Sequence, residues 1–178
     1  MKRQFVSQIM NDKRTIYVTS FPWDVTCLWL AASNQGLSVI EFERKQSFDS
    51  FKERFNGRLF EQMNDILYKV VEQLDNYFRG QPEAFNIPLD FLAGTTFQKA
   101  VWHQVRAIPY GRTKTYGQIA NELGQSRAVR AVGVANGANP LPVVVPCHRV
   151  IRTNGSLGGY SGGLDIKDAL LRLEGVVL

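Results

Sequence analysis

Apolar and polar residues alternate imperfectly through the first part of the chain, as expected for strands with both faces partly covered. Four strands are predicted, at residues 4–9, 14–20, 25–31 and 37–43. Two turns separate the paired strands, at Asn11-Asp12-Lys13 and at Asn34-Gln35-Gly36. Gly36 is free to take a positive φ at the second turn. We therefore predict two antiparallel hairpins that build one small sheet.

The apolar spacing then changes to the three-and-four pattern of an amphipathic helix. It predicts one long helix over residues 59–79, ending at Gly80. The apolar stripe of this helix consists of Leu59, Met63, Ile66, Leu67, Val70, Leu74 and Phe78. The aromatic-rich segment before it, residues 47–57, is predicted to be a loop or a short helix. The first part of the chain is thus a sheet with one helix packed on it.

A domain boundary is predicted near residue 92, after a connector that contains Pro82 and Pro88. Each proline fixes φ, removes a backbone donor and disfavours helix in the residue before it. The connector is therefore extended. We divide the chain into an N-terminal domain, residues 1–91, and a C-terminal domain, residues 92–178.

Helical patterns dominate the second domain. Thr95 and Gln98 have the spacing of a capping box, so a helix begins there, and Pro109-Tyr110-Gly111 ends it. Three further helices are predicted at about residues 116–123, 127–136 and 166–174, with Thr115, Ser126 and Asp165 as N-caps. The first two of these are joined by a tight turn at Gly124, which is a helix-turn-helix pattern.

This helix pair has two interpretations. Arg127 and Arg130 lie three residues apart, so they share a face, and small residues lie between them. Small residues permit close approach to a duplex, and the guanidinium groups offer contacts to phosphates or bases. The other interpretation is a small-residue helix packed on the core, with its arginines in solvent.

The segment from Pro140 to Val150 carries the candidate chemistry. Three valines, at positions 143–145, predict a short buried strand, and Pro146 fixes the backbone before Cys147. A cysteine can be a strong nucleophile, and His148 beside it is the residue type that activates one. A carboxylate that orients the histidine is also needed, and Glu174 is the candidate. The alternative is a buried structural cysteine.

Composition fits a protein with an ordinary core and a modest excess of positive charge. Apolar residues make up 44% of the 178 residues, and the net charge of +5 suits a polyanionic partner. Neither a membrane span nor a signal peptide is recognised, so a cytoplasmic location is predicted. There are two cysteines and two histidines without metal-binding spacing, so no metal is expected. A disulfide between Cys27 and Cys147 is disfavoured in a reducing cytosol.

Residues 90–175 resemble the O6-alkylguanine-DNA alkyltransferases. The resemblance rests on motifs that occur in order: Thr115-Tyr116-Gly-Gln-Ile-Ala120, Arg127-Ala-Val-Arg-Ala-Val-Gly133, Asn139-Pro140, Pro146-Cys-His-Arg-Val150, Gly159-Tyr-Ser-Gly-Gly163 and Leu173-Glu-Gly175. It implies an α+β fold. The N-terminal domain is a ribonuclease-H-like antiparallel sheet with a helix, and the C-terminal domain is mainly helical, with a winged-helix-like helix-turn-helix. Some members hold zinc in the N-terminal domain, but this chain lacks the ligands.

The resemblance also implies direct DNA repair without a cofactor, by a protein that acts as a monomer. Double-stranded DNA carrying O6-alkylguanine would be bound, and the damaged base would be flipped into a pocket. Cys147 would take the alkyl group irreversibly, one lesion per molecule, and O4-alkylthymine would be a further substrate. Two alternatives remain, a lesion-binding protein without transfer and an unrelated cysteine hydrolase.

The roles of individual residues follow from the same resemblance. Cys147 attacks as a thiolate, His148 acts as base through a bridging water, and Glu174 orients His148. Tyr116 donates to the purine N3, and Asn139 braces the active-site segment. Arg130 fills the space left in the base stack. The other expected DNA contacts are Arg127, Tyr116, Thr115, Ala131 and Gly133. The expected pocket residues are Val150, Tyr160, Ser161 and Arg149, with the carbonyls of Cys147 and Val150 reading the guanine amino group.

Overall fold

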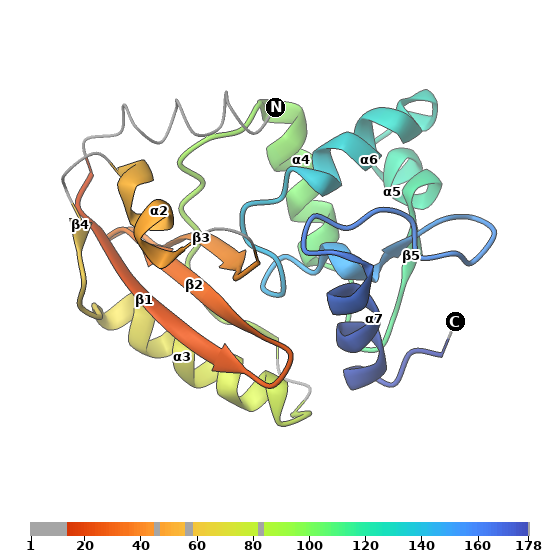
Figure 1. Ribbon diagram of the computed structural model, residues 1–178. Helices are drawn as coiled ribbons and strands as arrows, with labels where there is room; N and C mark the ends of the chain where they lie inside the picture. Colours follow the sequence, from red (N-terminus) through yellow and green to blue (C-terminus); the bar gives the residue numbers. More distant parts are fainter. Residues whose placement is uncertain (1–13, 45–46, 56–58, 82–83, 178) are drawn as a thin grey trace. The chain divides into compact units, whose positions relative to one another are not determined.

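The computed structural model describes residues 14–44, 47–55, 59–81 and 84–177 (Figure 1). The chain divides into two compact units, Met1–Ala93 and Gly94–Leu178. The first unit contains the larger sheet and the second is mainly helical, so the predicted α+β class is confirmed. The domain limits 1–91 and 92–178 stay a prediction. The strand predicted at 4–9 and the turn at 11–13 lie outside the described residues.

The first unit is built on a four-stranded sheet with the order β3-β2-β1-β4. Its strands are β1 (Ile16–Trp23), β2 (Thr26–Ala32), β3 (Leu37–Phe42) and β4 (Leu59–Phe60). β2 pairs antiparallel with both β1 and β3, whereas β4 runs parallel to β1. The strands predicted at 14–20, 25–31 and 37–43 are therefore confirmed, with ends that differ by up to three residues. A core cluster on this sheet contains Ile16, Val18, Trp29, Ala31, Val39, Phe51 and Phe55.

Gly36 is needed at its turn for a reason other than the one predicted. Its φ does not lie in the left-handed region. The backbone of the proline connector approaches it instead, because Leu37 N–H donates to the Pro88 carbonyl (2.9 Å) and Asp90 N–H donates to the Leu37 carbonyl (2.9 Å). A Cβ on Gly36 would lie 2.5 Å from the Pro88 oxygen. The connector is thus attached to the edge of β3.

The long helix predicted over 59–79 begins later than its apolar pattern suggested. Leu59 and Phe60 pair with β1, and α3 (Asp65–Phe78) starts after Asn64, whose side chain accepts from Leu67 N–H (3.0 Å). Pairing with the sheet and a strong N-cap outweigh the periodicity of the first six residues. The segment before β4 is helical, with α2 (Phe48–Lys52) and the 3₁₀ helix η1 (Glu53–Phe55). The short-helix alternative is therefore confirmed.

The second unit contains four α-helices (Figure 1). They are α4 (Thr96–Arg106), α5 (Tyr116–Glu122), α6 (Val129–Gly137) and α7 (Leu164–Leu173). Of these, α4 and α7 pack against the segment that carries Cys147. Reciprocal capping boxes start α4 at Thr95 and α5 at Thr115, as predicted. Two caps were predicted wrongly. Ser126 lies inside the 3₁₀ helix η2 (Ser126–Ala128) without a capping bond, and Gly163, not Asp165, is the N-cap of α7. None of the helices described is long and apolar enough to cross a bilayer.

The valines before Cys147 form a turn, so the predicted strand at residues 143–145 is wrong. Val143 is buried with φ at 74°, and Val145 N–H donates to the Leu141 carbonyl (2.8 Å). The prolines on both sides lack the N–H groups that a strand ladder requires. After this turn come the 3₁₀ helix η3 (Cys147–Arg149) and β6 (Val150–Ile151), which pairs parallel with β5 (Lys114–Thr115). A β-branched residue in the left-handed region is strained, so the surrounding contacts must hold this turn.

We predict that Gly36→Ala lowers the free energy of unfolding by about 2 kcal/mol, because the new Cβ overlaps backbone atoms of Pro88 that cannot move without breaking the connector's hydrogen bonds. Urea denaturation measures this change. Gly137→Ala is the control, since a Cβ there meets nothing within 4 Å and φ is ordinary. Equal stabilities of the two variants would contradict the close-contact explanation.

Candidate active site

Cys147 lies at the start of η3, and its side chain is buried, with 1% of its surface exposed. Asn139, just after α6, donates from Nδ2 to Cys147 Sγ (3.0 Å) and to the Val145 carbonyl (2.7 Å). Its Oδ1 accepts from Leu141 N–H (3.0 Å). One amide therefore holds both the sulfur and the strained turn before it. The structure thus brings the predicted pair Asn139 and Cys147 together.

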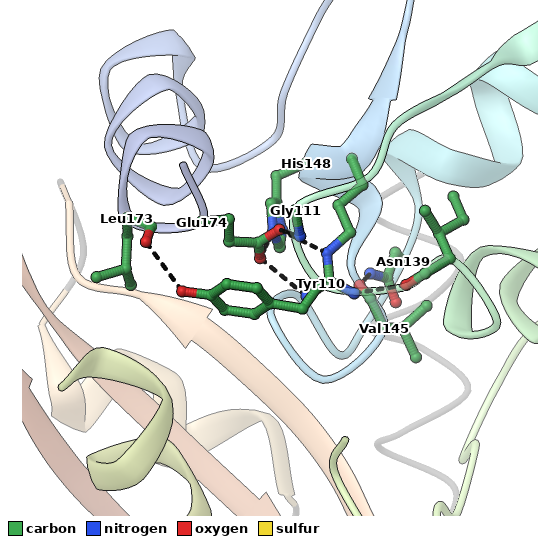
Figure 2. Close-up of polar contacts among 9 residues, drawn as sticks. Tyr110, Gly111, Asn139, Val145, His148, Leu173 and Glu174 are labelled. Carbon is green, nitrogen blue, oxygen red and sulfur yellow. Dashed lines mark hydrogen bonds and ion pairs between the residues drawn. The ribbon is translucent and has the colours of Figure 1, made fainter. Parts of the chain in front are cut away.

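The two residues that follow Cys147 belong to a buried ionic cluster, centred on Glu174 at the end of α7 (Figure 2). His148 Nε2 and Glu174 Oε1 are 2.7 Å apart. Arg149 donates hydrogen bonds to both carboxylate oxygens, from Nε to Oε2 (2.8 Å) and from a second nitrogen to Oε1 (2.9 Å). Gly111 N–H donates to Oε2 (3.2 Å), and Arg149 also donates to the Ile108 carbonyl (2.5 Å). Three predicted site residues therefore form one hydrogen-bonded group.

The cluster fixes the charge states of its members. Burial favours the neutral acid at Glu174, but the hydrogen bonds from His148 and Arg149 outweigh it and lower the pKa to about 2. Burial lowers the pKa of His148, although its hydrogen bond to Glu174 acts in the opposite direction. At neutral pH the site therefore holds an ionised Glu174 and a neutral imidazole. A neutral imidazole has a lone pair that can accept a proton.

Burial raises the pKa of the Cys147 thiol, and three neighbours act against this rise. In order of effect they are the hydrogen bond from Asn139, the positive charge of Lys167 and a hydrogen bond with Tyr160. The resting group is therefore the thiol, and it must lose its proton in order to react.

Lys167 was not among the residues that sequence reasoning selected. It lies on α7 and is fully buried, and it donates to the carbonyls of Val150 (2.6 Å) and Leu157. Burial lowers its pKa to about 8, so it is mostly protonated at pH 7. A carboxylate partner is absent among the described residues. No pattern in the sequence separates this lysine from an exposed one, because it stands next to the apolar stripe of its helix.

Tyr116 is placed between α6 and the loop that precedes α7. A Cβ built on Gly133 would lie 3.8 Å from its ring, and one on Gly158 would lie 3.0 Å from its hydroxyl. Burial raises the pKa of Tyr116, and the nearby Cys147 adds to the rise. The predicted residue Tyr116 is therefore close enough to Cys147 for the two groups to interact electrostatically. Ser161 is exposed on the loop, and Tyr160 is half-buried there.

The predicted helix-turn-helix consists of α5, η2 and α6, and α5 packs on α6. Arg127, Arg130 and Ala131 are exposed, whereas Thr115 and Gly133 are half-buried. The inner face of α6 meets the core, where Trp102 Nε1 donates to the Ala135 carbonyl (2.8 Å). One side of α6 is therefore packed on the core, as the second interpretation expects, and the exposed Arg127 and Arg130 are compatible with both interpretations. The described residues contain no group of three or more His, Cys, Asp or Glu side chains arranged to hold a metal.

Family models match both units of the chain. Residues 96–176 match the model for the DNA-binding domain of 6-O-methylguanine DNA methyltransferase. Residues 16–91 match the model for its ribonuclease-like domain. Together they span most of the sequence.

Similar proteins cover nearly the full length. The inducible methylated-DNA–protein-cysteine methyltransferase of Bacillus subtilis is 40% identical over 92% of this chain and 93% of its own. The Methanosarcina acetivorans methylated-DNA–protein-cysteine methyltransferase is 42% identical over 90% and 99%, respectively. The solved structure of Mycobacterium tuberculosis OGT in complex with DNA superposes with a TM-score of 0.77 at 37% identity, covering 89% of this chain and 92% of that one.

We predict that Glu174→Gln lowers the free energy of unfolding at pH 7 by about 3 kcal/mol, because Arg149 is left buried without its counter-charge. The folded-state pKa of Glu174 is below its unfolded value. Its stabilisation is therefore fully present above about pH 4.3 and is lost as the pH falls through about 2.

Urea denaturation at pH 7, 4 and 2 checks this prediction. The free energies of unfolding of wild type and variant should approach each other at pH 2. Glu122→Gln is the control, because its carboxylate pairs with Lys114 (2.6 Å) at the surface and its loss costs less than about 1 kcal/mol. A stability gap that stays constant from pH 7 to pH 2 would show that the ionised carboxylate is not its cause.

Proposed function

The chain belongs to the 6-O-methylguanine DNA methyltransferase family, and from this membership we propose how its buried cysteine takes an alkyl group from DNA. It is a methylated-DNA–protein-cysteine methyltransferase that acts in direct DNA repair, with DNA as its partner. The lesion is O6-alkylguanine in double-stranded DNA, with O4-alkylthymine as a second substrate, and the protein acts as a monomer. Both cysteines are free thiols, which suits the reducing cytoplasm.

The burial of Cys147 is the observation that carries this proposal. With 1% of its surface exposed, the sulfur is out of reach of a base that stays stacked in a duplex. The alkylated base must therefore leave the stack and enter the protein, which is the general solution for chemistry on a base. The unstacking costs a few kcal/mol, and contacts to the DNA backbone and to the extruded base offset it.

The helix-turn-helix provides the DNA-binding surface. Arg130 is exposed on α6 and fills the space that the extruded base leaves, and Arg127 contacts the backbone one turn earlier. Ala131 and Gly133 have little or no side chain, so they allow the helix to approach the minor groove. Thr115 lies at the start of α5 and contacts the DNA backbone there.

The transfer is a displacement at the alkyl carbon. His148 accepts the thiol proton through a bridging water, and Glu174 orients the imidazole and stabilises it when charged. The Cys147 sulfur then forms a bond to the alkyl carbon as the bond from this carbon to O6 breaks, and the electron pair goes to the guanine. Tyr116 donates to N3 of the purine as the negative charge develops there, and Asn139 keeps the sulfur in line.

The base pocket is formed by the loop before α7 and the segment after Cys147. Tyr160 and Ser161 line it and provide a donor toward O6, while the carbonyls of Cys147 and Val150 read the guanine amino group. Arg149 supports this pocket indirectly, because its hydrogen bonds to Glu174 fix the segment that carries Cys147.

The product is an alkyl thioether on Cys147. A thioether has no easily displaced group, so nothing in the site regenerates the thiol. One protein molecule therefore repairs one lesion, and Cys147 is consumed.

We predict that the intact protein gains the mass of one methyl group on Cys147 after incubation with a duplex containing O6-methylguanine. Mass spectrometry of the protein and of its Cys147 peptide measures this. Cys147→Ser should bind the same duplex and gain no mass, whereas Cys27→Ser should react like wild type. Tight DNA binding with an unchanged mass in wild type would point to a lesion-binding protein without transfer.

We predict that Arg130→Ala slows repair of the duplex by roughly tenfold or more, but leaves the reaction with free O6-benzylguanine nearly unchanged, because the free base does not have to be extruded. Single-turnover rates on the two substrates measure the difference. Arg79→Ala removes an exposed arginine of the first unit and serves as the charge control. Equal losses on both substrates would count against a role for Arg130 in base extrusion.

A further inference from the structure

Asn136 on α6 is a buried amide with only one of its two polar atoms satisfied. The side chain is 3% exposed, and Nδ2 donates to the Cys147 carbonyl (3.3 Å). Because a carbonyl only accepts, this contact identifies the nitrogen, and the other amide atom is an acceptor. That atom, Oδ1, is buried without a hydrogen-bond partner among the described residues. An unpaired buried acceptor is costly, so an incoming donor would be bound favourably.

The position of Asn136 places this acceptor on the face of α6 that lines the active site. Gly133, three residues earlier, lies against the Tyr116 ring, and residues three apart share a helix face. Asn139, three residues later, contacts Cys147 Sγ. Asn136 therefore lies in the chain between a residue that meets Tyr116 and one that contacts the sulfur.

The chemistry of the substrate limits which donor can arrive. Alkylation of guanine at O6 removes the proton from N1, so N1, N3 and N7 are all acceptors. The exocyclic 2-amino group is then the sole donor on the base, and it carries two hydrogens. The two backbone carbonyls proposed to read it already accept from the protein, Cys147 from Asn136 (3.3 Å) and Val150 from Lys167 (2.6 Å). Each of these carbonyls has one lone pair left for the base, whereas no protein donor among the described residues uses Asn136 Oδ1.

We propose that Asn136 is a specificity-determining residue, whose Oδ1 accepts a hydrogen bond from the 2-amino group of the extruded base. The second amino hydrogen goes to the backbone carbonyls. The same amide donates to the Cys147 carbonyl. One side chain therefore couples recognition of the base to the position of Cys147. This inference rests on the proposed base extrusion and adds to it a side chain that selects guanine derivatives over bases without a 2-amino group.

The test compares two duplexes that differ only in the 2-amino group, one with O6-methylguanine and one with O6-methylhypoxanthine. Single-turnover rates of methyl transfer to Cys147 are measured by mass spectrometry. We expect wild type to favour the first duplex by roughly tenfold. Asn136→Leu should reduce this ratio to near one, and Asn136→Asp, which keeps an acceptor, should preserve it. Asn121→Leu, an exposed position on α5, is the matched control and should behave like wild type.

If the role of Asn136 is purely structural, Asn136→Leu slows methyl transfer from both duplexes equally. An unchanged ratio of the two rates in this variant would overturn the proposal. If that variant does not fold, Asn136→Ser, whose shorter side chain does not reach as far, carries the same expectation. The rate of Cys147 alkylation by iodoacetamide reports separately whether the thiol has been disturbed. Absence of transfer from either duplex by wild type would refute the proposed function itself, whereas normal transfer with an unchanged ratio would refute only the role of Asn136.

Discussion

The buried carboxylate of Glu174 is the constraint on which the second unit depends. An ionised carboxylate is costly to bury unless its oxygens are saturated with donors. Here His148, Arg149 and the backbone of Gly111 provide them, and these groups come from separate parts of the chain. The end of α7, the segment after Cys147 and the turn after α4 are therefore fixed relative to one another. Loss of Arg149 would leave the carboxylate without a counter-charge in the core.

This arrangement explains how an unfavourable backbone is maintained beside the reactive residue. Val143 has a φ that a valine rarely adopts, and Asn139 holds the turn through the Val145 carbonyl while it also contacts the sulfur. The ionic cluster fixes the chain on the other side of Cys147. Cys147, which receives the alkyl group, is thus fixed by contacts on both sides of it in the chain before the substrate binds. Little reorganisation therefore remains for the reaction step. Burial keeps the thiol protonated at rest, while Asn139, Lys167 and Tyr160 oppose that effect.

The residues found from sequence and those found only from structure differ in kind. Cys147, His148 and Glu174 were selected because their side chains are typical of nucleophilic chemistry and occur in a distinctive motif. Asn136 and Lys167 have no comparable sequence signal, since an amide in a small-residue helix and a lysine beside an apolar stripe are usually solvated. Their importance arises from burial and from the carbonyls that they contact, Cys147, Val150 and Leu157. Neither burial nor those contacts can be read from local spacing.

The sequence by itself determined the α+β class, three of the strands, the helix-turn-helix and the capping boxes at Thr95 and Thr115, because local periodicity and short-range hydrogen bonds specify these features. Tertiary structure decided where local preference is overruled. Pairing with β1 makes Leu59 and Phe60 a strand. The flanking prolines and the Asn139 amide make the three valines a turn and not the predicted strand. It also decided the charge states of the active site. A pKa depends on which groups surround a side chain in space, and folding brings His148 and Glu174 together across 26 residues of sequence.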